Sequence, residues 1–283
     1  MKISIITASY NYAQYIEETI NSVINQSYSD WELIVVDDGS SDNSVEIIKS
    51  YCEKDSRIKL LQHEKAQNKG LKDSLLLGIE NATGAWVAFL ESDDFFAPDN
   101  LSKKAEIIKQ NPSVKLVFNK VEFLCEEGVT KKRVEDLENI QNSLSKIKFP
   151  RNMFYDFYIN NRILTFSCVM VEAKTLKTTN FKTPTDAILD WWLWIHMAYK
   201  NDFYCIDEKL THWRLHADSY ILNSKKPMLY FVQVQAYNDI YKNNPREIGL
   251  LFFILYSAVI LFFFRFFRFI AKVFRRLKRG FSI

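Results

Sequence analysis

The sequence of 283 residues is poor in glycine, proline and cysteine, of which it contains 7, 6 and 4. So little glycine and proline excludes collagen-like and low-complexity chains. The cysteines stand far apart and form no CxxC pair, which argues against a zinc site and indicates free thiols in a reducing cytosol. A GxGxxG fingerprint and a phosphate-cradling glycine loop are also missing, which disfavours oxidoreductases and nucleotidyltransferases on a similar sheet.

The sequence also lacks a long apolar stretch near its start and an excess of positive charge in its body. The run from Ile3 to Ala8 is too short for a signal-peptide core, so we expect the body of the protein to stay in the cytoplasm. Residues 265–283 contain seven basic residues and no acid, so residues 1–264 carry a net charge of −4 although the whole chain carries +3. A mildly acidic body predicts no nucleic-acid partner.

Residues 2–124 alternate between short β-branched runs and stretches with helical spacing. This alternation predicts an α/β fold with a mostly parallel sheet and helices on both faces. Ligands of such sheets bind beyond the carboxyl ends of the strands, which is where three polar clusters occur. The predicted strands are 3–6, 31–36, 57–62 and 85–90, the predicted helices are 12–25, about 41–53 and 71–81, and the polar clusters are 7–11, 37–42 and 91–94.

The later part of the chain is less regular, and residues from about 125 to 160 are polar and without a clear period. Apolar patterning returns after this segment. It predicts strands at 164–171 and 203–206 and helices at 186–199 and 229–241, with Pro245 before an apolar terminal segment.

Two acidic clusters can carry chemistry. Asp37 and Asp38 can accept hydrogen bonds from a ligand N–H, although this segment can equally be a helix N-cap. Glu91, Asp93 and Asp94 can hold a hard divalent metal that takes further ligands from a diphosphate. A solvated acidic turn is the alternative for this second cluster.

In this order and spacing, the clusters resemble the family 2 glycosyltransferases with the GT-A fold. The resemblance is strong over roughly residues 2–110 and weaker over about 160–220. It implies a GT-A domain at 1–223, with a nucleotide-sugar-binding half at 1–110 and an acceptor half at 111–223. The apolar and basic pattern of residues 224–283 separately predicts a helical membrane-associating region. The matching stretches are Ser4–Asn11, Asp37–Ser40, Asn68–Gly70, Gly84–Asp94 and Pro98–Asp99.

The resemblance implies a donor site for a nucleotide-sugar. Tyr10 packs against the base, and Asp38 accepts the uracil N3–H, which favours UDP. The family usually has an Arg-Asn pair where this chain has Leu75-Leu76, so Lys72, about one turn earlier, stands in as the diphosphate cation. The implied nucleotide-sugar-binding residues are Ala8, Tyr10, Asn11, Asp38, Lys72, Ser92, Asp93 and Arg214.

The resemblance also implies a divalent cofactor, Mn²⁺ or Mg²⁺. The DxD signature of the family is written Glu91-Ser92-Asp93 here, and Asp93 is the metal-holding acid. In the stretch Trp213–His216, Arg214 pairs with phosphate and His216 completes the metal shell, with a structural histidine as the alternative.

The evidence for the acceptor half is the stretch Leu189–His196. Family members carry Glu-Asp at its start, followed by an aromatic helix. The resemblance makes Asp190 the catalytic base, with Leu189 in place of the Glu. A carboxylate beside tryptophans loses water and gains a raised pKa, which suits a base, although an N-cap aspartate is the alternative. Among the tryptophans, Trp191 and Trp192 are the candidates for stacking on an acceptor sugar.

The tail combines an apolar run with a basic helix face. Residues 248–264 are 17 uncharged residues, about 25 Å as a helix against roughly 30 Å of hydrocarbon. Residues 265–279 then place arginines and lysines on one face. We expect residues 248–279 to form an interfacial or re-entrant helix on an anionic membrane surface, at the cytoplasmic face of the inner (plasma) membrane. A buried core helix, or a helix that joins two copies in a homo-oligomer, is the alternative.

Together with the pattern of the tail, the resemblance implies a membrane-associated, metal-dependent glycosyltransferase of the hexosyltransferase class, and the resemblance alone implies that it inverts configuration. It moves a sugar from a nucleotide-sugar, UDP being favoured, to a hydroxyl of a lipid-linked or surface-glycan saccharide. The departures at Leu75, Leu76 and Leu189 keep one alternative open, a non-catalytic membrane-docking module that retains the GT-A fold.

Overall fold

The computed structural model describes residues 1–159, 161–183, 188–216, 227–244, 255 and 259. The chain divides into two compact units, Met1–Ser224 and Lys225–Ile283. Most of the predicted apolar run and all of the basic helix face lie outside the described residues. No helix within the described residues is long and apolar enough to cross a membrane. The domain boundaries given above, including the one near residue 110, stay predictions.

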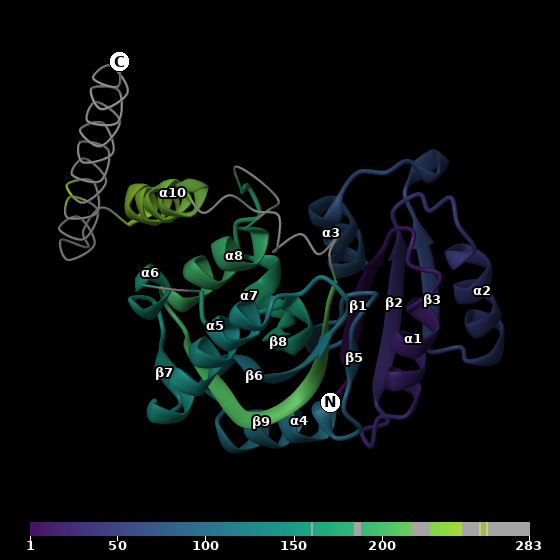
Figure 1. The fold of residues 1–283 in the computed structure, drawn as a ribbon, viewed down its shortest axis with the longest axis horizontal. Coiled ribbons are helices and arrows are strands. Elements are labelled where there is room, and N and C mark those ends of the chain that lie inside the picture. Colours follow the sequence, from purple (N-terminus) through teal and green to yellow (C-terminus); the bar gives the residue numbers. More distant parts are fainter. Residues whose placement is uncertain (160, 184–187, 217–226, 245–254, 256–258, 260–283) are drawn as a thin grey trace, which may run out of the picture. The chain divides into compact units, whose positions relative to one another are not determined.

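The first unit is a mixed α/β structure built on a nine-stranded sheet (Figure 1). Helices flank the sheet, and the long strand β9 curves around its second half. The strands are β1 (Ile3–Ser9), β2 (Trp31–Asp37), β3 (Ile58–Gln62), β4 (Trp86–Phe89), β5 (Phe95–Phe96), β6 (Val114–Cys125), β7 (Arg151–Asn152), β8 (Val169–Glu172) and β9 (Asp202–Leu215). The helices are α1 (Ile16–Ile24), α2 (Ser44–Lys54), α3 (Leu71–Asn81), α4 (Asn100–Gln110), α5 (Lys131–Asn142), α6 (Asp156–Ile159), α7 (Ala173–Lys177) and α8 (Leu189–Ala198), with 3₁₀ turns η1 (Glu64–Ala66), η2 (Ser143–Lys146) and η3 (Phe166–Cys168). In the second unit the described helix is α10 (Pro227–Asn243).

The strand order is β3-β2-β1-β4-β8-β6-β9-β5, with β7 paired to β9. Strands β1 to β4 are parallel to one another, which confirms the predicted parallel order for the first half of the chain. Strand β8 runs antiparallel to β4 and β6, and β5 and β7 run antiparallel to β9, so the whole sheet is mixed. The carboxyl ends of β1, β2 and β4 therefore meet at one edge.

Alternating side chains of β1 face two different helix layers. Ile3 and Ile5 belong to a core cluster that includes side chains of α1, α2 and α4. Ile6 faces α3 instead, where a Cβ built on Gly78 would stand 2.6 Å from its Cγ2 atom. Only glycine permits this close approach of α3 to the sheet.

Two sequence predictions about the second half were incomplete. The polar segment predicted as irregular contains α5, which begins at Thr130, whose side chain accepts a hydrogen bond from the backbone N–H of Arg133. The helix has few apolar residues, so its period was hard to recognise. The strand predicted at 164–171 begins with the 3₁₀ turn η3 and becomes extended only at Val169. The helix predicted at 229–241 is confirmed as α10.

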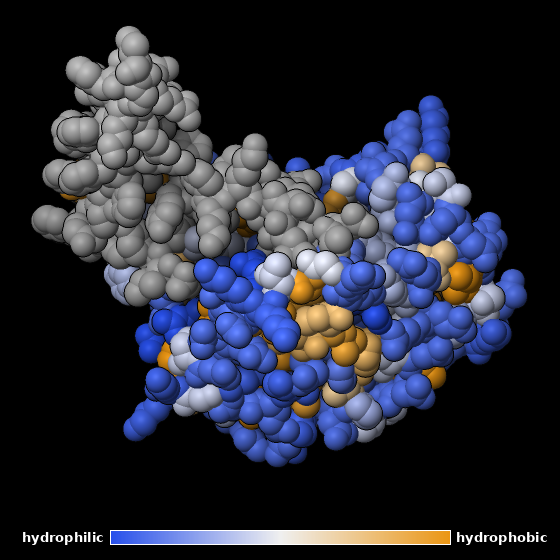
Figure 2. All heavy atoms as spheres, in the orientation of Figure 1, coloured by the Kyte–Doolittle hydropathy of each residue, from blue (hydrophilic) through white to orange (hydrophobic). Residues whose placement is uncertain are grey.

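The surface in Figure 2 is mostly hydrophilic, in keeping with an apolar core. Few large apolar side chains are exposed within the described residues. They are Met1, Tyr10, Tyr155, Leu255 and Val259. Tyr10 is the one among them that follows β1 at the edge where the strand ends meet.

A buried carboxylate stabilises the opposite edge of the sheet. Glu32, at the start of β2, is 2% exposed and accepts hydrogen bonds from Ser4 Oγ, from Thr83 and from Lys59 Nζ at 2.9 Å. Burial alone would raise the pKa of Glu32, but these hydrogen bonds lower it well below its usual range. Lys2 Nζ pairs with the same carboxylate. The amino ends of β1, β2 and β3 are thus joined at one carboxylate.

Lys104 in α4 is a buried lysine without an ion pair. It is 0% exposed, and its Nζ atom has no hydrogen-bond partner among the described residues. The ammonium lies 5.5 Å from the centroid of the Phe96 ring. Burial lowers the pKa of Lys104 to about 7, because a charge loses its water shell there. Burial of this ammonium therefore lowers the free energy of unfolding at neutral pH.

Replacing Lys104 by Met should stabilise the fold at pH 7 by on the order of 2–4 kcal/mol, because methionine fills a similar volume without a charge. In the unfolded chain this lysine keeps its proton to about pH 10. Folding of the natural chain therefore releases a proton between about pH 7 and pH 10, and its free energy of unfolding should rise through that window. Urea unfolding at pH 7 and pH 10 measures both effects.

The difference in free energy of unfolding between Lys104→Met and the natural chain should shrink towards pH 10, where the natural lysine is largely neutral in both the folded and the unfolded state. The matched control is Lys109→Met, because Lys109 is an exposed lysine of the same helix. A Lys104→Met variant that is less stable than the natural chain at pH 7 would contradict the assigned cost.

Candidate active site

The candidate site lies where the carboxyl ends of β1, β2 and β4 meet. Ser9 pairs with Asp37 in the register of β1 and β2, and the backbone N–H of Asp38 donates to the carbonyl of Ser9 at 2.8 Å. The third strand, β4, ends just before Glu91, whose backbone N–H donates to Ser167 Oγ at 2.9 Å. The three polar clusters predicted from the sequence are thus brought together.

Asp38 binds the loop before α3. Its two carboxylate oxygens accept the backbone N–H groups of Lys69 and Gly70 at 2.7 and 2.9 Å. Gly39 has a φ of +81°, and a Cβ there would stand 2.5 Å from the carbonyl oxygen of Ala66, so this turn requires glycine. Each carboxylate oxygen has a second lone pair. The contact of Asp38 with a uracil N3–H stays a prediction.

Asn11 links the segments after β1 and β2. It has a positive φ of 56°, and its Oδ1 atom accepts the backbone N–H of Ser41 at 2.7 Å. Its own backbone N–H donates to Ser40 Oγ at 2.9 Å. The preceding residue, Tyr10, is 46% exposed, so its ring is open to a planar ligand such as a base.

Asp93 and His216, both predicted as metal ligands, stand together although they lie 123 positions apart in the sequence. The Nε2 atom of His216 lies 3.1 Å from Oδ2 of Asp93. The imidazole is buried and packs between Tyr12 and Tyr15, at 6.1 Å between ring centroids in each case. Asp93 itself is half-buried, and so it can reach a ligand from the solvent side.

Arg214, at the end of β9, holds the turn that carries Asp93. Its backbone N–H donates to Oδ1 of Asp94 at 2.9 Å, and its Nε donates to the carbonyl oxygen of Asp93 at 3.0 Å. The guanidinium pairs with Glu18 at 2.6 Å and lies 3.6 Å from Glu126. The predicted pairing of Arg214 with phosphate stays a prediction, and the structure adds a positioning contact.

Sequence reasoning missed the residues that surround this arginine. The ring of Tyr15 lies under the guanidinium, with 4.6 Å between its centroid and the Cζ atom. The hydroxyl of Tyr15 donates to Glu126 Oε1 at 2.9 Å. Burial and this hydrogen bond raise the pKa of Tyr15. Tyr15 and Glu126 lie far apart in sequence, and no motif joins them.

The two acids beside Asp93 are held inside the protein. Asp94 is 1% exposed and accepts the hydroxyl of Ser167 at 2.5 Å. Glu91 accepts the hydroxyl of Thr165. Burial, followed by the charge of Asp93, raises the pKa of Glu91 to about 7 and raises the pKa of Asp94 well above its usual range.

Asp190, the predicted base, lies in the first turn of α8. Its Oδ2 atom accepts the side-chain amide of Asn161 at 2.8 Å. Burial raises the pKa of Asp190 to about 6, and the backbone N–H of Trp191 and the Asn161 amide offset part of this rise. The charge of Asp190 also raises the pKa of Glu91. One turn after Asp190, the indole of Trp194 packs against Phe89 and Phe166, at 6.5 and 5.5 Å between ring centroids. Asn161 was not predicted from the sequence.

The tryptophans after Asp190 are largely inside the protein. Trp191 is 7% exposed and donates from Nε1 to the carbonyl of Phe157 at 3.0 Å. Trp192 is 4% exposed and donates to the carbonyl of Asn180 at 2.8 Å. Both indoles therefore contribute to the core around α8. Their predicted contact with an acceptor stays a prediction.

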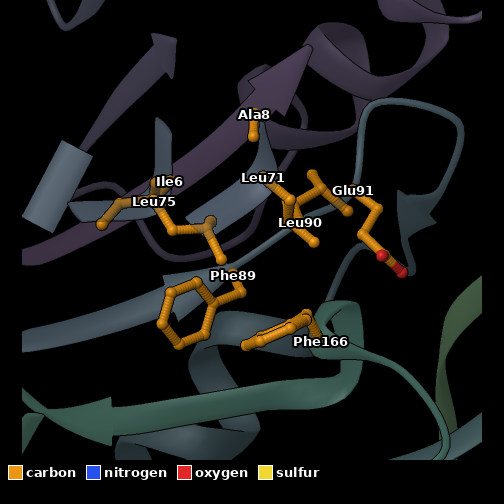
Figure 3. A pocket seen from close by; sticks show the side chains of 8 residues that line it. All are labelled: Ile6, Ala8, Leu71, Leu75, Phe89, Leu90, Glu91 and Phe166. Carbon is orange, nitrogen blue, oxygen red and sulfur yellow. The ribbon is translucent and has the colours of Figure 1, made fainter. Parts of the chain in front are cut away.

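A small open pocket lies beside Glu91, between β1, α3, β4 and η3 (Figure 3). Leu75 and Ala8 are both among the residues that line it. Lys72, the predicted diphosphate cation, does not line this pocket and lies 3.7 Å from Asp73. The side chain of Lys72 is 34% exposed. Its role with a diphosphate stays a prediction.

The residues present fit a divalent cation that arrives with an anionic ligand. Asp93 and His216 stand together, and within the described residues no group of three or more His, Cys, Asp or Glu side chains is placed to hold a metal ion. Two protein ligands are sufficient for Mg²⁺ or Mn²⁺ when phosphate oxygens and water supply the rest. A half-buried carboxylate with a pKa near 6, such as Asp190, can also accept a proton from a hydroxyl at neutral pH.

Comparisons with known sequences match most of this chain to a family model and to named relatives. A family model described as glycosyl transferase family 2 matches residues 4–178. TuaG of Bacillus subtilis (strain 168), named for teichuronic acid biosynthesis, is 31% identical over 228 residues, which cover 79% of this chain and 83% of TuaG. WfgD of Escherichia coli, named a UDP-Glc:alpha-D-GlcNAc-diphosphoundecaprenol beta-1,3-glucosyltransferase, is 28% identical over 205 residues, covering 72% of this chain and 73% of WfgD.

Solved structures share the fold. S. aureus TarS 1–349 in complex with UDP-GlcNAc superposes with a TM-score of 0.62 at 21% identity, covering 85% of this chain and 67% of that one. The mannosyltransferase PcManGT from Pyrobaculum calidifontis, in complex with GDP-Man and Mn²⁺, gives a TM-score of 0.59 at 17% identity, covering 85% of this chain and 64% of that one. The mixed sheet of this chain is thus the sheet of the GT-A fold.

Replacing Arg214 by Met should loosen the Asp93–Asp94 turn, because the side-chain hydrogen bond to the Asp93 carbonyl and the ion pairs are lost. We expect a loss of about 1–3 kcal/mol in the free energy of unfolding. Hydrogen exchange at the Asp94 amide should become faster. Glu18→Gln is the matched control, because Glu18 is 54% exposed and its pair should contribute only about 0–1 kcal/mol. Unchanged exchange at Asp94 in the Arg214→Met variant would contradict the positioning role.

Proposed function

The chain belongs to glycosyl transferase family 2 and is a glycosyltransferase that uses a nucleotide-sugar donor, and we propose that it is a membrane-associated, metal-dependent inverting enzyme. The donor is a UDP-sugar, and the acceptor is a hydroxyl of a lipid-linked saccharide. The observation that carries this proposal is the pair of Asp93 and His216, 3.1 Å apart, at the carboxyl ends of the parallel strands. Asp190 lies in the first turn of α8, whose Trp194 packs against Phe166.

The donor binds along the carboxyl ends of β1, β2 and β4. The exposed ring of Tyr10 stacks on the base, Ala8 and Asn11 lie beside the nucleoside, and Asp38 accepts the base N3–H. The UDP-GlcNAc complex of TarS, a protein of the same fold, supports a uridine nucleotide. Asp38 favours uracil because a carboxylate can accept a hydrogen bond from N3–H, whereas adenine has no N–H at the corresponding ring position.

Asp93 and His216 hold the divalent metal, and Ser92 shapes the turn between Glu91 and Asp93. The ion supplies Lewis-acid stabilisation of the charge on the departing nucleoside diphosphate when it is bound. The Mn²⁺ complex of PcManGT, which shares the fold, supports this cofactor. Lys72 lies in the first turn of α3, and Arg214 donates a hydrogen bond to the carbonyl of Asp93, and the two side chains add positive charge for the diphosphate.

Asp190 removes the proton from the acceptor hydroxyl as that oxygen attacks the anomeric carbon. Attack from the face opposite the diphosphate inverts the configuration. The amide of Asn161 holds one oxygen of Asp190 at 2.8 Å, which orients the carboxylate and leaves the other oxygen for the acceptor. The acceptor approaches over α8, where Trp191 and Trp192 lie.

The acceptor is lipid-linked, and the tail binds the membrane that holds it. Two described residues of the tail, Leu255 and Val259, are one helical turn apart and 53% and 51% exposed. We expect this apolar face to insert at the headgroup boundary of a bilayer. The basic residues within 265–279 then bind anionic lipid headgroups. The name of WfgD, whose acceptor is a diphosphoundecaprenol-linked sugar, supports this acceptor class. The enzyme works at the cytoplasmic face, where nucleotide-sugars are made.

Asp190→Asn should lower turnover by on the order of 10²–10⁴-fold and leave donor binding nearly intact. Asp93→Asn should instead weaken Mn²⁺-dependent donor binding, because a neutral amide is a poorer ligand for a hard cation. In the natural chain, kcat/KM should rise with pH through about 6, since the raised pKa of Asp190 keeps it protonated below that value. Calorimetry with UDP-sugars and a pH–rate profile measure these effects.

The same variants separate an enzyme from a non-catalytic docking module. Donor hydrolysis by the natural chain that depends on Mn²⁺ supports the enzyme. Near-natural turnover by Asp190→Asn would show that the base lies elsewhere.

Replacing Arg268, Lys272, Arg275 and Arg279 by Gln should weaken binding to anionic vesicles more than to neutral ones. Each basic residue near the surface contributes about 1 kcal/mol, and salt should reduce this contribution. Vesicle sedimentation at two salt concentrations measures the effect. The matched control changes four exposed lysines of the body, Lys54, Lys109, Lys131 and Lys132, to Gln. Protease protection tests the orientation: a C-terminus on the side of the membrane opposite the catalytic domain would contradict the interfacial helix.

A further inference from the structure

The pocket beside Glu91 is apolar although it lies next to a site for charged and hydroxylated ligands. We propose that it receives a methyl-terminated substituent of the donor sugar, either the methyl of an acetamido group or the methyl of a 6-deoxy sugar. This inference rests on the proposed function and adds the substrate class to it. The pocket is lined by Ile6, Ala8, Leu71, Leu75, Phe89, Leu90, Glu91 and Phe166.

The position of the pocket places it beside the donor sugar. Glu91 lies at its edge, two residues before Asp93. Trp194, one turn after Asp190 in α8, packs against the pocket walls Phe89 and Phe166, with 6.5 and 5.5 Å between ring centroids. A donor with its diphosphate at Asp93 and its anomeric carbon facing Asp190 has its sugar ring between these two acids. The ring then stands over Glu91, and one of its substituents points into the pocket.

The chemistry of the walls selects an apolar group. Leu75, Phe89 and Phe166 are 3%, 1% and 6% exposed, and they enclose the inner part of the pocket. The one charged side chain in the lining, Glu91, turns its carboxylate away from the two phenyl rings (Figure 3) and accepts the hydroxyl of Thr165. The free space inside admits a group the size of a methyl or a water molecule.

A hydroxyl in this space would lose its water partners and find few new ones. A buried water typically makes about three hydrogen bonds, which these walls do not supply. A methyl group gains from burial, and leaving a hydroxyl unpaired has a cost. Differences of one such group in an apolar pocket change kcat/KM or affinity by roughly 10–100-fold.

The test compares dissociation constants of UDP-sugars for the full chain by calorimetry in MnCl₂. UDP-N-acetylglucosamine against UDP-glucose tests the acetamido methyl, and UDP-6-deoxyglucose against UDP-glucose tests the 6-deoxy methyl. We expect a preference of roughly 10–100-fold for the methyl-bearing donor in one of the two pairs. The pair that shows it identifies the substituent.

Variants of α3 test whether the donor preference depends on the side chains that line the pocket. Leu75→Asn should reduce the preference to less than about threefold, because its amide offers partners to a hydroxyl and fills the space with a polar group. Leu75→Met, of similar volume, and Leu76→Asn, the neighbour that does not line the pocket, should both keep it. Should Leu75→Asn fail to fold, Leu71→Asn serves instead, since Leu71 is only half-buried at the mouth.

Three results would overturn the inference. UDP-glucose that binds as tightly as both methyl-bearing donors contradicts the pocket assignment and leaves the proposed function standing. Absence of binding by all three UDP-sugars contradicts the proposed function, and the pocket assignment falls with it. A preference that survives Leu75→Asn and Leu71→Asn places its origin outside this pocket and also contradicts the inference.

Discussion

The site depends on the buried carboxylate of Asp94, which joins the two halves of the first unit. One oxygen accepts the hydroxyl of Ser167, just before β8, and the other accepts the backbone N–H of Arg214 at the end of β9. Asp94 itself belongs to the turn after β4, in the half that binds the nucleotide. A carboxylate that is 1% exposed is costly to bury, and two directed hydrogen bonds offset that cost only in one geometry. The turn that carries Asp93 is therefore fixed by partners from distant parts of the chain.

The first half of the fold could be predicted because its information is local. β1 and β2 are almost entirely buried, so their sequences are continuous β-branched runs, and α3 begins and ends at the predicted residues. Asp93, Asp190 and His216 were predicted from short motifs. The structure brings Asp93 next to His216 at 3.1 Å and places Asp190 in the first turn of α8.

The remaining features arise from contacts between distant residues, which no local pattern encodes. Tyr15 under Arg214, Glu126 beside it and Asn161 on Asp190 each belong to an element that the motifs do not reach. Lys104 was indistinguishable from its exposed neighbours in α4, because lysine in a helix is ordinarily solvated. Such residues become recognisable only when the sheet has placed them.

The close approach of α3 to β1 at Gly78 has a consequence for how the donor preference of such a chain can diverge. Gly78 lies one turn after Leu75, and the same helix supplies two walls of the apolar pocket. A larger residue at position 78 would meet Ile6 and lift the helix from the sheet, which widens the pocket without changing any side chain that lines it. Substrate range in this architecture is therefore a property of helix–sheet spacing, and a single exchange outside the site is a short evolutionary route to a new sugar.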